Sequence, residues 1–332
     1  TGNRNGDVTV NLTTGENTTS TTLTVTQSAA ESLDAANSLT VVTDRGSVSL
    51  DNTALDKIAR SVTSASVEIT IQKTSISTEG VEASYRVSVQ SGAKDLLPSG
   101  EANGTITITV PSPVVGQTAS AYQAWYVTGE ADAMSYVEKL AIRDAEGGKI
   151  AIAIGHLSDI VLVKNDNAPA VVAEIVNGNQ FTTLQGAINA AQEGQTVALL
   201  GNIVLDKPVV VSGDKTVTLD LSGCTVTPGD GYTKSALVLV EADGSLTIKD
   251  SKTGGAVGTA ESYTARGIST KGTLRLEGGT VCADEIGILA SPSAVLEVTG
   301  GTVAVTNAES STGEAIKAQF KSTVKLSGGT IQ

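Results

Sequence analysis

Two cysteines, one histidine, one tryptophan and one methionine occur among the 332 residues of this chain, and aromatic residues make up only 3 %. One histidine and two separated cysteines cannot supply the usual ligand set of a zinc site. Cys224 and Cys282 fall two repeats apart, about 10 Å if stacked strands are ~4.8 Å apart, whereas a disulfide needs Cα atoms within about 7 Å. We therefore expect two free, buried thiols and no cofactor.

Positive charge is also scarce. The chain has 22 Lys and Arg against 35 Asp and Glu, a formal net charge of −13, and no basic cluster. Such a chain would not displace counterions from a phosphate backbone, so nucleic acid is not an expected partner. No apolar run is long enough to span a bilayer, and the first residues given do not have the charged-then-apolar pattern of a signal peptide, so we expect no direct membrane insertion.

Glycine and a repeated pattern are abundant instead. The chain has 35 glycines, and the pattern Leu-x-Leu-x-Gly-Gly-Thr-Val or a degenerate form of it recurs at Leu219–Val226, Leu246–Val257, Leu274–Val281, Leu296–Val303 and Val324–Ile331. The glycine pairs begin at positions 254, 278, 300 and 328, so the period is 22 to 28 residues. A period in this range predicts stacked units that share one core, with the threonines of the pattern in register.

A short amphipathic helix is expected directly before the repeats. Thr182 or Thr183 can cap a helix that carries Leu184 and Ile188 on one face and ends at Gly194. Such a helix would cover the open edge of the first repeat. The chain stops at Gln332 directly after a repeat, so we expect it to be a fragment of something longer.

Residues 1–166 have a different pattern. Short segments of alternating Val, Ile and Thr, separated by turn residues, predict antiparallel strands, for example Tyr122–Thr128 and Lys149–Ile154. Two short helices are predicted, one from a capping box at Ser28-Ala-Ala-Glu31 through Ala36, and one capped by Asp51 or Asn52.

Two stretches resemble known families. Gly104–Pro111 (GTITITVP), Ala124–Val127 (AWYV) and Arg143–Val163 (RDAEGGKIAIAIGHLSDIVLV) resemble a module of Gram-positive, gut-associated surface proteins that often carry S-layer homology domains. The chain has His156-Leu157-Ser158 where that module has His-Phe-Ser. Phe181–Leu205 and the TVTLDLSGCTV segment resemble the start of pectate-lyase-like right-handed parallel β-helices.

The resulting fold prediction is mainly β: N-terminal β-sandwich-like modules with two short helices, followed by a helix-capped right-handed parallel β-helix. The predicted parts are a β-rich module over 1–100, an antiparallel β module over 101–166 that either joins the first or stands alone, a linker over 167–180, and the β-helix over 181–332, truncated at its C-terminus.

Four residues are candidate ligand contacts. Tyr122 and Trp125 lie in an aromatic cluster that could stack on sugars or could simply form the core. Asp230 and Tyr232 lie on a loop between repeats, where the alternative is an ordinary turn.

No catalytic residue is predicted. A carbohydrate-active enzyme on this fold would need carboxylates about 5–10 Å apart in one groove, and the acidic residues near the repeats are Asp220, Asp250, Glu277, Asp284 and Glu285. Acidic and basic residues alternate at the variable positions of the repeat, which is typical of a solvated face. His156, the single histidine, has Ser158 and Asp159 as neighbours, and we interpret it as structural.

The expected function is that of an extracellular protein of the bacterial cell surface with a structural or adhesive role. Its expected partners are host or cell-envelope glycans and other copies of surface proteins. Two alternatives stay open: a polysaccharide lyase or glycoside hydrolase built on the β-helix, and a self-assembling surface-layer or filament subunit that pairs by strand addition at its terminal repeat.

Overall fold

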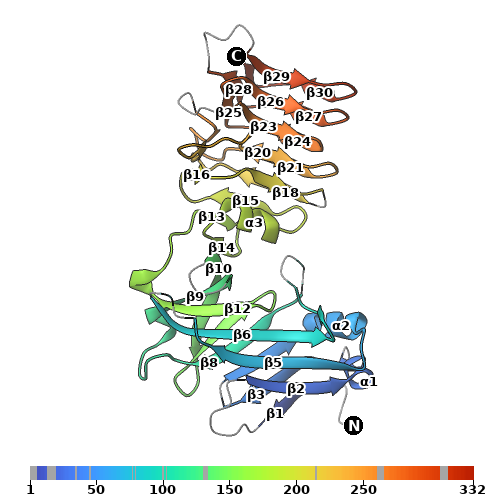
Figure 1. The fold of residues 1–332 in the computed structure, drawn as a ribbon, viewed down its shortest axis with the longest axis vertical. Helices are drawn as coiled ribbons and strands as arrows, with labels where there is room; N and C mark the ends of the chain where they lie inside the picture. The colour runs from blue at the N-terminus through green and yellow to red at the C-terminus, as the bar shows by residue number, and fades with distance from the viewer. Residues whose placement is uncertain are drawn as a thin grey trace. The chain divides into compact units, whose positions relative to one another are not determined.

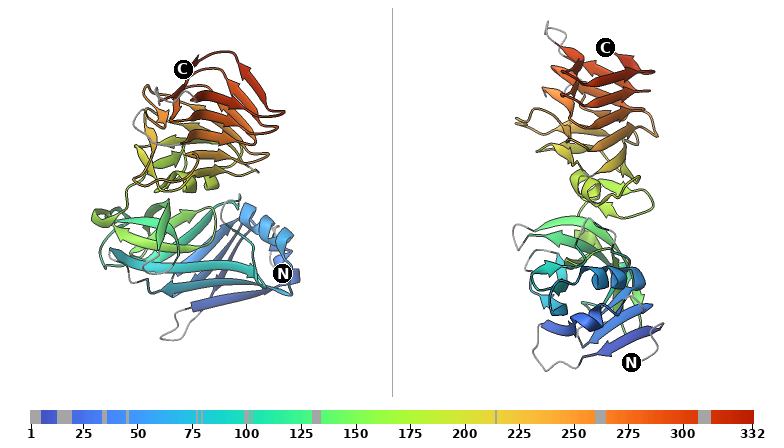
Figure 2. Two further views of the ribbon diagram at one scale, coloured as in Figure 1. Left: turned by 45° about the horizontal axis from the view of Figure 1, so that its top comes forward. Right: turned by 90° about the vertical axis from the view of Figure 1, so that its right-hand side faces the viewer.

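The computed structural model is mainly β and divides into two compact units, Thr1–Ala170 (unit 1) and Val171–Gln332 (unit 2), each with its own hydrophobic core (Figures 1 and 2). The structure describes residues 6–12, 20–33, 36–44, 46–76, 78, 80–98, 101, 103–129, 134–213, 215–259, 265–306 and 313–332.

Unit 1 contains two sheets that share the long strand β10 (Ser135–Ala145). The first has the order β1-β3-β4-β8-β11-β10, antiparallel except for the parallel β1–β3 pair. The second has the order β2-β5-β6-β12-β9-β10, all antiparallel, with β7 paired to the end of β6. The other strands are β1 Asp7–Asn11, β2 Ser20–Thr26, β3 Ser38–Thr43, β4 Gly46–Asp51, β5 Ser66–Thr74, β6 Val81–Ser91, β7 Lys94–Asp95, β8 Ile106–Pro111, β9 Tyr122–Thr128, β11 Lys149–Ile154 and β12 Asp159–Lys164.

The two sheets of unit 1 enclose one core. In β3, β4 and β8, alternate residues are buried, as expected for strands with one buried face. The core draws on both halves of the unit, for example Val48 and Ile69 from the first hundred residues and Ile108, Ile152 and Ile160 from the rest. Residues 1–100 and 101–166 therefore belong to one unit.

The two helices of unit 1 differ in how well the sequence predicts them. α2 (Asn52–Ser61) begins where predicted, because the Asp51 carboxylate accepts the Ala54 N–H at 2.9 Å. α1 is only Gln27–Ala30, and its N-cap is Thr26, the last residue of β2. The predicted capping box at Ser28 is wrong because the helix follows the strand without a break. Residues 34 and 35 of the predicted helix lie outside the described residues.

Unit 2 contains three parallel sheets through which the chain passes in turn. We call one such pass a rung. Because each rung adds one strand to each sheet, every strand pairs with its counterparts one repeat away. The sheets are β15 Thr196–Leu199, β18 Thr216–Asp220, β21 Ser245–Lys249, β24 Thr273–Leu276, β27 Val295–Val298 and β30 Thr323–Leu326; then β16 Ile203–Leu205, β19 Thr225–Pro228, β22 Ala256–Val257, β25 Thr280–Ala283, β28 Thr302–Val305 and β31 Thr330–Ile331; and β17 Val209–Val211, β20 Val238–Val240, β23 Arg266–Thr270, β26 Ile286–Ala290 and β29 Glu314–Ala318.

The repeat pattern sets the register of these sheets. The threonines at positions 280, 302 and 330 pair in one row, which confirms the predicted alignment for the three clear repeats. Val281 and Val303, which follow the first two of these threonines, lie inside the core. Gly300 allows the rungs to approach closely, because a Cβ there would lie 2.2 Å from the backbone oxygen of Glu277.

A short helix and a β-hairpin precede the first rung. α3 (Leu184–Ala190) is capped by the Thr183 hydroxyl, which accepts the Gly186 N–H at 3.0 Å, and it ends before the predicted Gly194. The Gln185 side chain extends the pairing of β17: its Oε1 accepts the Val210 N–H at 2.7 Å and its Nε2 donates to the Val210 oxygen at 2.9 Å. One amide side chain thus satisfies the edge of the first strand in this sheet.

The range predicted as a linker, 167–180, contains two short strands in the structure. β13 (Ala173–Ile175) pairs antiparallel with β14 (Gln180–Phe181) on one side and with β15 on the other. Strands of two or three residues carry too little alternation to be recognised in a sequence.

Candidate functional site

The aromatic residues expected as sugar contacts lie on β9 and are buried. Tyr122 packs into the core of unit 1, and its hydroxyl donates to Gln117 Oε1 at 2.5 Å. Trp125 lies on the other face of the strand, is 0 % exposed, and meets the Tyr136 ring edge-on at 5.9 Å between centroids. A stacking platform of Tyr122 and Trp125 is therefore not formed, and the core alternative fits both rings.

The single histidine sits in a buried polar cluster in unit 1. His156 Nδ1 lies 3.0 Å from the Ser158 hydroxyl, and Nε2 lies 3.4 Å from Glu138 Oε2. The ring of Tyr126 contacts the imidazole edge-on at 4.5 Å between centroids. Sequence inspection pairs the histidine with Ser158 and Asp159 but misses Glu138.

The directions of the hydrogen bonds in this cluster argue against Ser158 as a nucleophile. The Ser158 hydroxyl donates to the Leu157 carbonyl at 2.5 Å, so its oxygen can only accept from His156 Nδ1–H. A catalytic serine would instead donate to the imidazole. Asp159 is held elsewhere, by two bonds from Arg86 at 2.6 and 2.8 Å. The geometry thus fits a structural role for His156.

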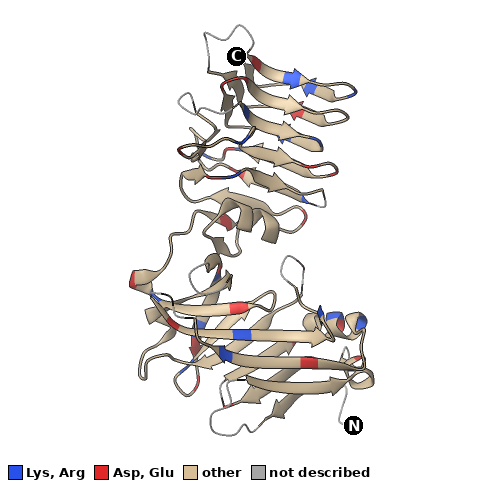
Figure 3. Cartoon of the chain, viewed as in Figure 1, with Lys and Arg blue, Asp and Glu red and all other residues tan. Residues whose placement is uncertain are grey.

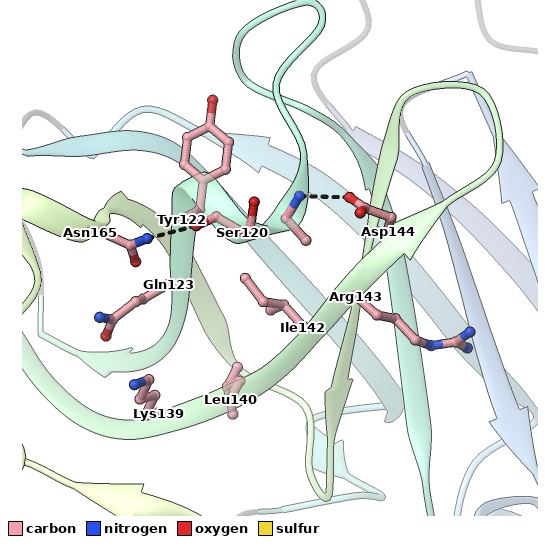
Figure 4. Close-up of a pocket in the computed structure, with 10 residues that line it drawn as sticks. Ser120, Tyr122, Gln123, Lys139, Leu140, Ile142, Arg143, Asp144 and Asn165 are labelled. Carbon is pink, nitrogen blue, oxygen red and sulfur yellow. Dashed lines mark hydrogen bonds between the residues drawn. The ribbon is translucent and has the colours of Figure 1, made fainter.

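An open hollow of about 470 Å³ lies beside β9 and β10 of unit 1 (Figure 4). Gln123, Lys139 and Asn165 lie along one side of it, and Leu140 and Ile142 along the other. No hydrogen bond or ion pair to another described residue engages the Lys139 ammonium or the Gln123 amide. The hollow therefore offers a cation and an amide that no described residue engages, together with an apolar wall.

Neighbouring residues hold the rim of this hollow in place. Asp144 accepts the Ala119 N–H at 2.7 Å, and Asn165 Nδ2 donates to the Ser120 carbonyl at 2.7 Å, as the dashed lines in Figure 4 show. Arg143 points away from the other lining residues. A second hollow of about 340 Å³ has Arg86 in its lining, but that guanidinium is neutralised by Asp159.

Two of the candidate catalytic carboxylates in unit 2 bind backbone at the turns between rungs. Asp220 accepts the N–H groups of Ser222 at 2.9 Å and Ser251 at 3.0 Å. Asp250 accepts those of Gly223 at 2.7 Å and Gly255 at 2.8 Å. Each carboxylate therefore joins its own turn to the adjacent rung.

This corrects the expectation that Asp220 is a solvated surface residue, since it is only 6 % exposed. Burial by itself raises the pKa of this carboxyl. The N–H groups of Ser251 and Ser222, the Ser251 hydroxyl and the Lys249 ammonium together outweigh that effect and lower the pKa below its ordinary value. The carboxylate is thus held ionised for hydrogen bonding.

The outer face of the β24-β27-β30 sheet carries a ladder of opposite charges. Arg275 bonds Glu277 at 2.7 Å and Glu297 at 3.2 Å, and Lys325 bonds Glu297 at 2.9 Å. Lys325 and Arg275 lower the pKa of Glu297. Figure 3 shows both signs of charge along the strands of unit 2. Glu277 is therefore part of an exposed ion-pair ladder, as the alternating charges of the repeat predict.

The loop residues Asp230 and Tyr232 differ in how far they are exposed. Asp230 is exposed. Tyr232 is half-buried against the core of unit 2, its hydroxyl donates to the Ala236 carbonyl at 2.6 Å, and burial with the nearby Asp206 charge raises its pKa to about 12. The ring therefore braces the loop, and the expectation that both residues contact a ligand stays a prediction.

The remaining acidic residues and the cysteines have separate surroundings. Asp284 accepts the Thr306 hydroxyl at 3.0 Å, and Glu285 is exposed. Both cysteines are free thiols; Cys282 is buried as expected, whereas Cys224 is only half-buried because its position lies in a turn. Burial and the Asp284 charge raise the pKa of Cys282.

Comparisons with known proteins add no relative. No protein-family model, curated protein or solved structure matches this chain. Among the described residues, no three His, Cys, Asp or Glu side chains gather in a way that could hold a metal ion. No helix within the described ranges has the length and apolar character to cross a membrane.

Proposed function

We propose that this chain is part of an extracellular bacterial surface protein with a structural or adhesive role. In this proposal, unit 1 is a β-sandwich-like module and unit 2 is a right-handed parallel β-helix that serves as a rigid stalk. Glycans of the host or of the cell envelope would bind to its loops. The resemblance of two segments to gut-bacterial surface proteins gives the proposed setting.

The observation that carries the proposal is the way the turns of unit 2 are fastened. Asp220 and Asp250 each bond to backbone of two successive rungs, and the core of unit 2 is a column of apolar side chains contributed by every rung. Carboxylates engaged in this way stiffen the stack and are not available as a proton donor and acceptor pair. A stiff column with a polar, charge-balanced outer face suits presentation at a distance.

Two measurements on the full chain test this proposal. Antibodies against the chain should label intact cells of the producing bacterium as strongly as permeabilised ones; labelling only after permeabilisation would contradict a surface location. On a glycan array, the chain should bind a subset of glycans, and Tyr232→Ala should weaken that binding if the loop between β19 and β20 is the contact.

The enzyme alternative makes a distinct prediction. A lyase or hydrolase on unit 2 would release unsaturated or reducing ends from polysaccharides, and replacing Asp220 or Asp250 by Asn would abolish that release. Under our proposal, neither product forms, and the same variants change only the stability of the stack.

A further inference from the structure

We propose that the hollow beside β9 and β10 in unit 1 binds a sugar residue that carries a carboxylate, a uronic acid or a similar acidic sugar. This site is separate from the loops of unit 2 and goes beyond the role proposed above. It is defined by Lys139, Gln123 and Asn165 on one side and by Ile142 on the other.

The charge of Lys139 points to an anionic ligand. The protein as a whole has a formal net charge of −13, and most of its described cations lie within 4 Å of a carboxylate or donate to backbone oxygens. Lys139 is half-buried in the hollow and has no such partner among the described residues. Because partial burial lowers the effective dielectric, a carboxylate that enters the hollow would interact with this ammonium more strongly than with an exposed lysine.

The amides beside Lys139 point to hydroxyl groups on the same ligand. The Gln123 amide has no partner among the residues that the structure describes, so it can both donate and accept. Asn165 already donates through Nδ2 to the Ser120 carbonyl, which fixes its orientation and leaves its Oδ1 as an acceptor toward the hollow. A donor and acceptor beside a cation match the hydroxyls and carboxylate of one sugar ring.

The opposite wall points to a ring with an apolar face. Ile142 is half-buried, packs on the core of unit 1 from one side, and faces the hollow with the other. The C–H groups of a pyranose could lie against it while its hydroxyls face the amides. The volume of about 470 Å³ falls in the range of about 300–1,000 Å³ that is typical of small-molecule sites.

The expected affinity is modest, because the hollow is open and covers only part of a ligand. We expect a Kd on the order of 1 mM for a monosaccharide. Such a site would matter chiefly on a polymer, where several chains or several sugar residues bind together.

The test uses the full chain and calorimetric or NMR titration with D-galacturonate, with D-galactose and acetate as matched ligands. Galacturonate should bind at least about tenfold more tightly than either, since galactose lacks the carboxylate and acetate lacks the hydroxyls. Lys139→Gln should weaken galacturonate binding by at least about tenfold. Lys73→Gln, an exposed lysine of β5 outside the hollow, should leave it unchanged.

Three outcomes would overturn the proposal: no galacturonate binding, equal binding of acetate or sulfate, or galacturonate binding that persists in Lys139→Gln. Tryptophan emission of the Lys139→Gln variant must match that of the parent chain, and Gln123→Leu supplies a second variant if it does not. Loss of array binding in Tyr232→Ala with galacturonate binding intact would separate this site from the loop of unit 2.

Discussion

Units 1 and 2 build sheets of opposite kinds from a similar set of residues. Unit 1 uses long antiparallel strands, up to the 11 residues of β6 and β10. In the described part of unit 2, no strand exceeds the 5 residues of β18 or β21, and all three stacked sheets are parallel. Long strands fix register through many pairs, whereas short ones depend on their turns.

The buried polar groups of the two units follow this difference. Unit 1 holds Glu138 and His156 inside its fold, where each is at most 6 % exposed. Unit 2 keeps its carboxylates Asp220 and Asp250 at the turns, and the core inside its rungs is apolar. Polar contacts thus specify the packing between sheets in one unit and the stacking of rungs in the other.

The two units can be observed separately in one chain. Trp125, the single tryptophan, lies in unit 1, so its emission reports that unit. Both cysteines lie in unit 2, so thiol reactivity, measured relative to the unfolded chain, reports the other.

The largest effect is expected from the buried pair of unit 1. Glu138→Ala should lower its free energy of unfolding by about 3–5 kcal/mol, because the buried imidazole loses its partner. Urea unfolding followed by Trp125 emission measures this, and thiol protection in unit 2 should not change. The double variant Glu138→Leu/His156→Leu should lose less than either single change. If Glu138→Ala lowers the free energy of unfolding no more than the replacement of an exposed residue does, the structural role assigned to the Glu138–His156 pair is wrong.

Close approach of the rungs should make unit 2 sensitive to one methyl group. Gly300→Ala places a Cβ against the Glu277 carbonyl and should cost about 1–3 kcal/mol through overpacking. Thiol labelling in urea that is faster than in the parent chain would report this loss of stability. The control is Gly201→Ala in the same unit, where nothing lies within 4 Å of the added Cβ and no loss is expected.

Removing a carboxylate from a turn should have a smaller effect. Asp250→Ala leaves the N–H groups of Gly223 and Gly255 to bond with water instead and should cost about 1 kcal/mol. Asp250→Asn retains one acceptor and should cost less. Asp230→Ala, at an exposed loop position, should not change thiol protection; an equal loss there would mean that the turn bonds contribute nothing specific.

The smallest effects at neutral pH concern two tyrosines, Tyr85 in unit 1 and Tyr232 in unit 2. Burial raises the pKa of Tyr85 in unit 1 and, with the Asp206 charge, that of Tyr232 in unit 2, from 10.0 to about 12. Because the folded state favours the neutral phenol, this stability is present below pH 10 and is lost as the pH rises toward 12.

Urea titrations at several alkaline pH values should therefore show both units weakening over this range. Tyr232→Phe should reduce the alkaline effect in unit 2 and leave that of unit 1 unchanged, at a neutral-pH loss of about 1 kcal/mol for the bond to the Ala236 carbonyl. The part that remains in unit 2 is expected from Cys282, whose pKa is also raised. If unit 2 of this variant weakens as the parent does, the Tyr232 hydroxyl is not the responsible group.

Sequence periodicity predicts the regular parts of both units well. β9 and β11 occur at the predicted residues. In β11 isoleucine alternates with alanine, which gives the strand one clear phase. The rows of threonine in unit 2 follow from the repeat alone. A column of identical residues can be stacked in only one register without exposing the core.

The candidate sites are harder to predict because they depend on irregular geometry. Tyr136 and Glu138 are two residues apart, so plain alternation puts them on one face. A break in register between them sends Tyr136 toward Trp125 and Glu138 toward His156. The hollow likewise combines Gln123, Lys139 and Asn165 from three separate elements, which no local pattern connects. Asp220 had a usable signal, an Asp at a strand end two residues before Ser222-Gly223, which is typical of a turn.

The uniform pairing of the rungs makes length an adjustable property of this protein. Each copy of the repeat presents the same three strands to the next, so an added copy would meet the neighbours it already suits. The Gln185 amide occupies the strand edge at the other end and is untouched by such an insertion. Duplication of one repeat would therefore lengthen unit 2 by about 4.8 Å without any other substitution. The length of the stack could thus evolve in steps, independently of the residues that bind a ligand.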